Sequence, residues 1–400
     1  MIKNRDIIIV GQQPWDVEIG SNCKNIAIEF SKNNRVLYVN SPLDRFTSLR
    51  NQHDPKIQKR INVIKNKEIG LIKVGNNIWN LFPNRMIESI NWIGSHRIFA
   101  FLNKLNNKRF AISIKEAIVK LGFNDFILFN DNDIFRCFYL KELLGPSISI
   151  YYSRDYMLAV DYWKKHGELF EPLLIKKVDL CLANSTYLAD YCKQYNPNSI
   201  YVGQGCDLDI FSDQNEYETP FDMAIIKSPV IGYIGALLGL RLDLSILIHI
   251  AKLKPEWSLV LVGPEDEAFK NSELHRLPNV HFLGSKPSND LPNYIHSFDV
   301  CINPQLVNQV TIGNYPRKID EYLAMGKPVV ATKTAFMQSV FSNYTYLGDN
   351  GDDYINLIEL ALIENSEVRK LARMQFANTH SWENCVETIY DSIDNLSKTE

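Results

Sequence analysis

The chain has 400 residues, of which 46% are hydrophobic and 22% are charged, a composition typical of a soluble globular protein with about two domains. Its 46 acidic residues nearly balance the 43 lysines and arginines, and a net charge of −3 argues against a general nucleic-acid binder. Seven dispersed cysteines without a C-x-x-C pair favour reduced thiols in the cytoplasm, and the apolar stretches are too short for a membrane-spanning helix, so we expect any contact with the inner face of a membrane to be peripheral.

The N-terminal half of the chain alternates short apolar runs with helical patterns. We expect strands at Ile7–Val10, Val36–Val39, Phe126–Phe129, Ile148–Tyr151, Val178–Ala183 and Ile200–Val202, and helices at Ser21–Asn33, Arg97–Leu121 and Thr186–Gln194. Alternation of this kind predicts a parallel sheet with helices on both faces.

The alternation lapses between Cys206 and Ser228, where a polar segment without periodicity ends in proline. It then resumes with predicted strands at Val230–Ile234, Leu259–Val262, Val280–Leu283, Val300–Asn303 and Val329–Ala331, and with helices at Asp243–Leu253, Asn289–Phe298 and Pro316–Met325. The sequence therefore predicts an α/β protein with a doubly wound domain at residues 1–205, a linker at 206–228 and a second doubly wound domain at 229–378. The wholly helical last fifty residues end in a helix at 379–400, and we expect the two domains to face each other across a cleft at the carboxyl ends of their strands.

The segment from Tyr315 to Thr332 carries both architectural and chemical information. Pro316 suits the first turn of a helix, Asn314 is a candidate N-cap, and Gly326 suits the helix end. Lys318 and Glu321 share one face of that helix, so a phosphate can bind beside the lysine and sugar hydroxyls can donate to the carboxylate. The alternative from the residues alone is a surface helix with a solvated ion pair.

Glycine-containing turns follow three predicted strands of the second domain. The first holds Gly235 and, at the entry to the next helix, Arg241; the second holds Gly263; the third reads Gly284, Ser285, Lys286. Glycines let backbone amides approach an anion, and a guanidinium binds phosphate oxygens with its fork of donors. Ordinary turns of an α/β sheet are the alternative for each of them taken singly.

Other signals in the sequence are weaker. Asp131 and Asp133 have the D-x-D spacing that can hold a divalent metal, but the same spacing recurs at Asp207 and Asp209, so we favour a capped helix start and expect no metal. The helix predicted at Arg97–Leu121 mixes apolar residues with lysines. It suits either an anionic membrane surface or the solvated outer face of a core helix, and we favour the second.

Taken together, the motifs resemble those of the GT-B-fold bacterial glycosyltransferases, in particular retaining family 4 enzymes and teichuronic-acid-type polysaccharide transferases. The resemblance covers nearly the whole chain: GQQPWD and RVLYVNSP in the first domain, then GCDLDIF, VIGYIGALLGLRLD, NVHFLGSKP and PRKIDEYLAMGKPVVAT, and finally HSWEN. It implies two Rossmann-like domains facing a central cleft, with the acceptor bound by the first and a nucleotide sugar by the second.

The resemblance also implies roles for individual residues. Arg241 and Lys318 would neutralise the diphosphate, Glu321 would accept the ribose hydroxyls, and Gly235 and Gly263 would let the backbone approach the donor. Ser285 and Lys286 would flank the base. Where the family often has a second glutamate this chain has Gly313, so Asn314 and Tyr315, with Thr311, are the candidates for contacts to the donor sugar. Asp16 and Asp131 are the carboxylates that we expect nearest the reacting centre.

The function expected on this basis is metal-independent transfer of a sugar from a nucleotide-diphosphate sugar to a saccharide or lipid-linked glycan, without a cofactor. Two alternatives stay open at this point. One is a nucleotide-sugar epimerase on the same architecture, and the other is a non-catalytic protein that binds a sugar or nucleotide on that fold.

Overall fold

The computed structural model describes residues 2–17, 22–212 and 216–396. The chain divides into two units: unit 1 comprises Met1–Gly203 and Cys385–Glu400, and unit 2 comprises Gln204–Asn384. The predicted helix start at Ser21, residues 213–215 of the predicted linker and residues 397–400 of the predicted terminal helix lie outside the described residues. Each unit is defined by itself, so the cleft expected between the two domains stays a prediction.

Unit 1 is built on an eight-stranded sheet with the strand order β3-β4-β2-β1-β5-β6-β7-β8. Its strands are β1 (Asp6–Gly11), β2 (Arg35–Asn40), β3 (Leu71–Lys73), β4 (Ile78–Leu81), β5 (Ile127–Asp131), β6 (Ile148–Ser153), β7 (Leu180–Ala183) and β8 (Ser199–Tyr201). All neighbours are parallel except β3, which runs antiparallel to β4 at the edge. Every residue of β1 is buried, as expected for a parallel strand covered on both faces.

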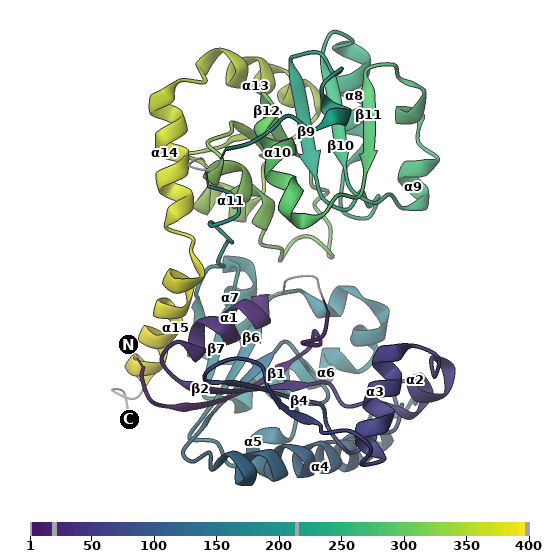
Figure 1. The fold of residues 1–400 in the computed structure, drawn as a ribbon, viewed down its shortest axis with the longest axis vertical. Helices are drawn as coiled ribbons and strands as arrows, with labels where there is room; N and C mark the ends of the chain where they lie inside the picture. The colour runs from purple at the N-terminus through teal and green to yellow at the C-terminus, as the bar shows by residue number, and fades with distance from the viewer. Residues whose placement is uncertain (1, 18–21, 213–215, 397–400) are drawn as a thin grey trace. The chain divides into compact units, whose positions relative to one another are not determined.

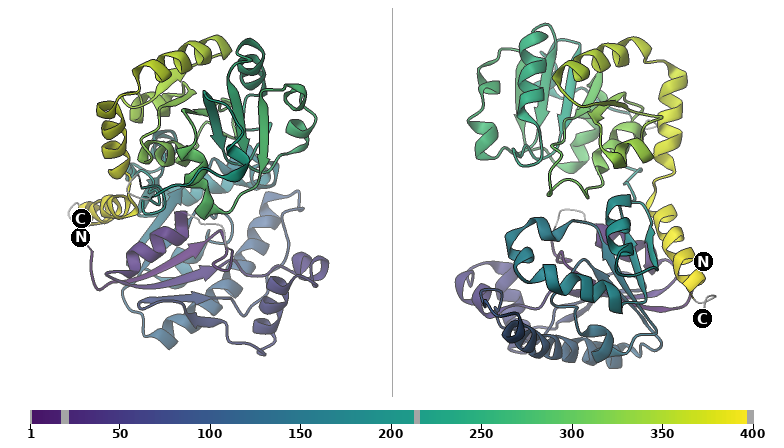
Figure 2. Two further views of the ribbon diagram at one scale, coloured as in Figure 1. Left: turned by 45° about the horizontal axis from the view of Figure 1, so that its top comes forward. Right: turned by 180° about the vertical axis from the view of Figure 1, so that it is seen from behind.

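The helices of unit 1 cover this sheet from two sides. They are α1 (Asn22–Ser31), α2 (Arg45–Arg50), α3 (Pro55–Ile64), α4 (His96–Leu121), α5 (Leu140–Leu144), α6 (Asp161–Lys177) and α7 (Thr186–Lys193). Figures 1 and 2 show α4 and α5 along one face of the sheet and α1 on the other. The long α4 begins at the N-cap Ser95 and ends at Gly122, whose φ of 62° is the left-handed stop that glycine allows.

Unit 2 contains a six-stranded, wholly parallel sheet with the order β11-β10-β9-β12-β13-β14. Its strands are β9 (Val230–Ile234), β10 (Ser258–Val262), β11 (Val280–Gly284), β12 (Val300–Asn303), β13 (Val329–Thr332) and β14 (Tyr346–Gly348). The order reverses at β9, which lies between β10 and β12. The carboxyl end of β9 is therefore the switch point at which open α/β sheets usually bind ligands.

Eight helices belong to the described part of unit 2, and the last of them continues into unit 1. They are α8 (Leu244–Leu253), α9 (Glu267–Lys270), α10 (Leu291–His296), α11 (Arg317–Ala324), α12 (Ala335–Val340), α13 (Gly351–Glu364), α14 (Glu367–Asn378) and α15 (Trp382–Leu396). Within unit 1 the end of α15 stacks the ring of Tyr390 on Phe30 of α1, with the ring centroids 5.4 Å apart. None of the described helices is long and apolar enough to cross a bilayer.

The segment predicted as a linker is partly integrated into unit 2. Cys206 donates its N–H to the carbonyl of His380 at 2.8 Å, and Met223 is 3% exposed in a short 3-10 helix at Phe221–Met223. The polar composition of residues 206–228 concealed these contacts, because the partners lie far away in the sequence.

Candidate functional site

The carboxyl ends of β9, β10 and β11 meet at two glycines with unusual backbone conformations. Gly235 has φ of 141° and Gly263 has φ of 149°, both in the region that favours glycine. A Cβ atom on Gly263 would lie 2.0 Å from the carbonyl oxygen of Gly235, so no larger residue fits there. The N–H of Gly235 donates to Val262 and that of Gly263 donates to Gly284, each at 2.9 Å, which ties the three strand ends together.

The side chain of Lys318 reaches this glycine turn from α11. A Cβ atom on Gly235 would lie 3.0 Å from the Nζ atom of Lys318, and the same ammonium lies 4.9 Å from the ring centroid of Tyr233. The strand end and the helix are also tied directly, because the hydroxyl of Tyr322 accepts the N–H of Ile234 at 2.9 Å. In the part of the chain that the structure describes, Lys318 makes no ion pair. Its ammonium is therefore placed at the switch point without a carboxylate partner.

The N-terminus of α11 differs from the one that the sequence suggested. The N-cap is Pro316, and no side chain caps the helix. The predicted cap, Asn314, instead donates its backbone N–H to the carbonyl of Thr311 at 3.0 Å within the preceding loop. The prediction of Asn314 as N-cap was wrong because the chain makes one more turn before the helix begins. No side chain caps the helix, but two of its first-turn amides already have backbone acceptors: Arg317 donates its N–H to Tyr315 at 3.0 Å, and Ile319 donates to Pro316 at 2.8 Å. The positive end of the helix dipole still favours an anion at this position.

Glu321 lies one turn further along α11, with a side chain that is 13% exposed. Its carboxylate accepts a hydrogen bond from the Nε of Arg317 at 3.1 Å, the i,i+4 geometry of a helix-surface ion pair. The pairing with Arg317 was not predicted. It holds the carboxylate in place and leaves further lone pairs for a hydroxyl donor.

Arg241 lies in the turn between β9 and α8, and its side chain is exposed. The carbonyl of Arg241 accepts the N–H of Leu306 at 2.9 Å, and Asn308 donates to the carbonyl of Leu240 at the same distance. These bonds join the turn of Arg241 to the long loop between β12 and α11. Arg241 and the start of α11 are thus held at the same edge of the sheet.

The two residues predicted to flank the base have different surroundings. Ser285 is exposed just after β11. Lys286 forms an ion pair with Asp222, at 2.6 Å between Nζ and Oδ2, and lies 5.2 Å from the ring centroid of Tyr294. Lys286 therefore joins the end of β11 to the 3-10 helix of the predicted linker, an interaction that the sequence did not reveal.

Tyr315 points into the interior of unit 2 and is 8% exposed. Its hydroxyl donates to Asp320 at 2.6 Å, and the other carboxylate oxygen of Asp320 lies 2.7 Å from Nδ1 of His380. Burial raises the pKa of Asp320 despite the hydrogen bond from His380. This geometry gives Tyr315 a structural role in holding α11, and its predicted contact with a donor sugar stays a prediction. Thr311 is likewise 1% exposed, and its hydroxyl bonds to the carbonyl of Leu306 in its own loop.

The two carboxylates predicted nearest the reacting centre both bind arginines of unit 1. Asp131, which is fully buried at the end of β5, accepts from the Nε of Arg154 at 2.8 Å. Asp16 accepts from both terminal nitrogens of Arg60, at 3.1 and 2.9 Å. Partial burial opposes the shift, but the hydrogen bonds and charge of Arg60 lower the pKa of Asp16. Each carboxylate therefore has an arginine partner within unit 1, and the catalytic role of both stays a prediction.

The D-x-D pair at Asp131 and Asp133 is divided between two arginines. Asp133 pairs with Arg136 and accepts the backbone N–H groups of Phe135 and Arg136 at 3.2 and 2.8 Å, which is the arrangement of a capped turn. Among the described residues, no cluster of three or more histidine, cysteine, aspartate or glutamate side chains could hold a metal ion.

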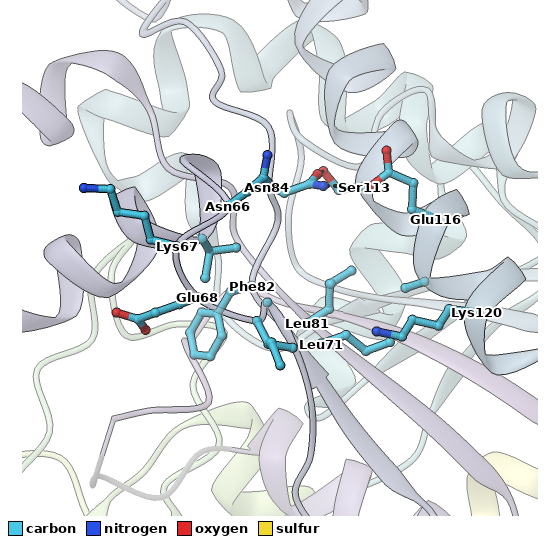
Figure 3. Close-up of a pocket in the computed structure, with 14 residues that line it drawn as sticks. Asn66, Lys67, Glu68, Leu71, Leu81, Phe82, Asn84, Ser113, Glu116 and Lys120 are labelled. Carbon is cyan, nitrogen blue, oxygen red and sulfur yellow. Dashed lines mark hydrogen bonds between the residues drawn. The ribbon is translucent and has the colours of Figure 1, made fainter.

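Two cavities formed by described residues of unit 1 were not indicated by the sequence. The larger has a volume of about 920 Å³ and lies between α2, the loop before α4, and the starts of α4 and α6, where Phe46, Trp92, Phe135 and Trp163 line it. The smaller, of about 410 Å³, lies beside the second half of α4. Figure 3 shows its apolar floor of Leu71, Leu81 and Phe82, with Lys67 and Lys120 at opposite ends.

The part of the chain that holds this site is similar to a known family of proteins. Residues 228–359, which include the glycine turns and α11, match the family model described as glycosyl transferases group 1. The matched residues all belong to unit 2, and each of the two units has the parallel-sheet architecture of a GT-B domain. The fold class and the family resemblance expected from the sequence are confirmed.

A particular relative can be named as well. The chain is 32% identical over 269 residues to TuaH of Bacillus subtilis (strain 168), which carries a provisional assignment as a teichuronic acid biosynthesis glycosyltransferase; the match covers 64% of this chain and 65% of TuaH. The chain thus spans less than two thirds of that relative's length.

Two solved structures extend the fold over almost the whole chain. HepE of Anabaena, in complex with UDP and glucose, has a TM-score of 0.64 at 14% identity and covers 97% of this chain and 99% of its own. Sucrose-phosphate synthase of Thermosynechococcus elongatus has a TM-score of 0.67 at 12% identity, over 99% of this chain and 100% of its own. At these identities the similarity establishes the fold.

Proposed function

We propose that the protein is a glycosyltransferase that moves a sugar from a nucleotide-diphosphate sugar to a saccharide or lipid-linked glycan in surface polysaccharide synthesis. The observation that carries the proposal is the position of the Lys318 ammonium at Gly235, where the carboxyl end of β9 meets an uncapped helix N-terminus. The ammonium and the positive end of the α11 dipole converge there on the place where α/β sheets bind ligands. The group 1 domain and the similarity to TuaH support the same reading.

The chemistry that this site suits is stabilisation of a leaving group. When the bond between the anomeric carbon and the phosphate oxygen breaks, its electron pair goes to the diphosphate, which gains negative charge. Lys318, the positive N-terminus of α11 and the exposed Arg241 would offset that charge from positions set before the reaction, which costs little reorganisation. Glu321, held by Arg317, would accept the ribose hydroxyls. We further propose that transfer retains the anomeric configuration and needs no metal, which NMR of the product and an assay in the presence of a chelator would test.

The large cavity of unit 1 is our candidate for the acceptor. It combines aromatic walls with amides and carboxylates, among them Asn91, Asp161 and Glu88, a mixture that suits the apolar faces and hydroxyls of a saccharide. The Oδ1 atom of Asn91 is buried without a hydrogen-bond partner, so a donor hydroxyl would satisfy it.

The decisive experiment is a calorimetric titration of UDP, the nucleotide in the HepE complex, against the wild type and Lys318→Ala. A hydrogen bond to a charged group contributes about 1.5–3 kcal/mol, so the variant should bind at least about tenfold more weakly. Lys252→Ala, which removes a surface lysine paired with Glu273 in the same unit, is the matched control and should bind like the wild type. If no nucleoside diphosphate binds, or if both variants bind equally well, the donor site is elsewhere.

Incubation with a nucleotide sugar and no acceptor separates the proposed transferase from an epimerase. An isomerised nucleotide sugar would support the epimerase, whereas transfer to an added acceptor would support the proposal and would also exclude a protein that only binds.

A further inference from the structure

The turn that follows β11 holds one ordered cation among exposed residues. Every residue from Gly284 to Asp290 is exposed except Lys286, whose side chain is 21% exposed. A lysine on a surface turn normally extends into solvent, because fixing its flexible stem costs conformational entropy. The surroundings of Lys286 must therefore provide contacts that offset this cost.

Asp222, from the segment predicted as a linker, holds the ammonium of Lys286. The Oδ2 atom of Asp222 lies 2.6 Å from Nζ of Lys286, and the hydroxyl of Tyr294 donates to Oδ1 of the same carboxylate at 3.0 Å. The ammonium also lies 5.2 Å from the ring centroid of Tyr294, which is 5% exposed. The hydrogen bond with Asp222 raises the pKa of Lys286, so the cation is fixed beside a carboxylate and an aromatic ring.

Asp222 is itself fixed on unit 2 by the segment around it. Met223, its neighbour, is 3% exposed, and Glu218 donates its backbone N–H to Oδ1 of Asn293 at 3.2 Å. Asn293 and Tyr294 both belong to α10. The segment at residues 218–223 thus packs on α10 and presents Asp222 to the turn after β11. The contact is more than an isolated surface ion pair, which would contribute little.

Lys286 follows a strand end that lies close to the proposed phosphate site. The strands β9, β10 and β11 are neighbours in this order, as Figure 1 shows, so β11 lies about 10 Å from β9. The N–H of Gly263 donates to the carbonyl of Gly284, which joins the ends of β10 and β11 into one edge. On the other side of β9, the loop after β12 is bonded to the turn of Arg241 through Leu306. A nucleoside whose diphosphate lies at β9 would therefore extend along β10 and bring its base to the turn of Lys286.

The strand β11 is irregular just before it reaches this turn. Leu261 of β10 pairs with Phe282, but the next residue, Val262, pairs with Gly284, so that Leu283 is one extra residue on β11. An extra residue of this kind bends a strand and changes the direction of the side chains that follow it. The shift in register therefore helps to set where Lys286 leaves the sheet.

We propose that Asp222 is a positioning residue that aims the ammonium of Lys286 at the nucleotide base, so that the site selects uracil over adenine. This inference rests on the proposed function, because it takes the donor to be a nucleoside-diphosphate sugar. An ammonium has three hydrogens and no acceptor, and a carbonyl oxygen of the base can accept a hydrogen that Asp222 does not use. Adenine presents an amino group where a pyrimidine such as uracil presents a carbonyl oxygen, and an amino group cannot accept from the fixed cation.

Calorimetric titration of UDP and ADP against the same variants tests the proposal, because the ratio of the two affinities reports the base and cancels the shared diphosphate. One hydrogen bond to a charged group is enough for the wild type to bind UDP at least about tenfold more tightly than ADP. Lys286→Met should reduce this ratio to about one. Asp222→Asn should weaken UDP binding by about two- to tenfold, the effect of having to order one flexible side chain on binding. Its affinity for ADP should stay unchanged, which also shows that the variant is folded.

Two variants serve as controls. Asp222→Glu keeps the carboxylate and should retain the preference for UDP. Asp290→Asn removes an exposed carboxylate from the same turn and should bind both nucleotides like the wild type. If Asp222 only stabilised the fold, Asp222→Asn would weaken UDP and ADP binding equally, and that result would overturn the proposal. A wild type without a preference for UDP, or an equal loss of the preference in Asp290→Asn, would overturn it as well.

Lys318→Ala separates this inference from the proposed function. It should weaken UDP and ADP binding alike, because the diphosphate is common to both. If the wild type binds neither nucleotide, the proposed function and this inference are both wrong. If Lys318→Ala weakens both nucleotides while Asp222→Asn changes neither, the donor site stands and only the role of Asp222 is refuted.

Discussion

Glu171 is a buried carboxyl group with no cationic partner among the residues that the structure describes. Its replacement by glutamine should reveal a pH-dependent cost to the stability of unit 1. It lies on α6 and is 2% exposed. Its two oxygens lie 2.6 Å from the hydroxyl of Tyr151 and 3.1 Å from that of Tyr191. The hydroxyl of Tyr151 also lies 3.1 Å from Oδ1 of Asn132. A protonated Glu171 can donate to Tyr151 while Tyr151 donates to Asn132, whereas an ionised Glu171 takes that hydrogen and leaves Asn132 without it.

The size of the pH-dependent change in folding free energy follows from the pKa of Glu171. Burial raises the pKa of Glu171 from 4.5 to about 7, although the hydrogen bonds from the two tyrosines oppose the shift. Because the folded pKa is the higher one, the group's stabilising contribution is fully present below pH 4.5 and is lost as the pH rises through 7. One pKa unit corresponds to about 1.4 kcal/mol, so the loss amounts to roughly 3 kcal/mol.

Glutamine keeps the shape of the neutral acid and cannot ionise. We expect the difference in melting temperature between Glu171→Gln and the wild type to grow between pH 5 and 8, by roughly 6–10 °C. Thermal unfolding at several pH values measures it. Glu168→Gln, on the same helix but with a side chain that is 64% exposed, should give a difference that does not change with pH. A difference for Glu171→Gln that is constant from pH 5 to 8, or that falls with pH, would refute the reasoning.

Two further predictions concern the donor site of unit 2. Gly263→Ala should destabilise unit 2 by more than about 1 kcal/mol and weaken UDP binding, because its Cβ would lie 2.0 Å from the carbonyl of Gly235. Gly284→Ala is the comparison, since its φ is also positive but no atom lies within 4 Å of the added carbon; calorimetry and urea unfolding of both variants would contradict the steric argument if they behaved alike. His380→Ala should cost about 1–3 kcal/mol in urea unfolding, because the fully buried Asp320 loses a hydrogen-bond partner. It should also weaken UDP binding through the displaced α11, and an unchanged affinity would show that this contact does not position the helix.

Much of the fold could be predicted from local pattern. The apolar runs at β9 and β12 gave those strands to the residue, and the helix from Arg317 to Ala324 lies within one residue of its predicted bounds. The edge strand β3 and its neighbour β4 were missed because both are short and β3 is mostly half-buried, so that neither shows a clear period. The pairing of strands that lie far apart in the sequence could not be predicted either, because the local pattern of residues carries no information about it.

In the candidate site too, some residues could be predicted from local sequence and others depend on distant contacts. Lys318, Gly235 and Gly263 could be found because strand ends and helix starts leave marks in the sequence. The role of Tyr315 could not, because its partner Asp320 is set by packing and His380 joins from a distant segment. For α4 the sequence favoured the solvated outer face of a core helix, and the structure buries one face of α4 and leaves its lysines exposed.

The seven cysteines have a practical consequence. All are free thiols and all are buried, by at least 96%. Cys206 and Cys301 belong to unit 2 and the remaining five to unit 1. Alkylation by iodoacetamide under native conditions can therefore proceed only when a region opens, and mass spectrometry of the labelled peptides would report the opening of each unit separately. The protein thus carries its own set of intrinsic probes, with which the response of either unit to a bound ligand can be followed without introducing any other reporter.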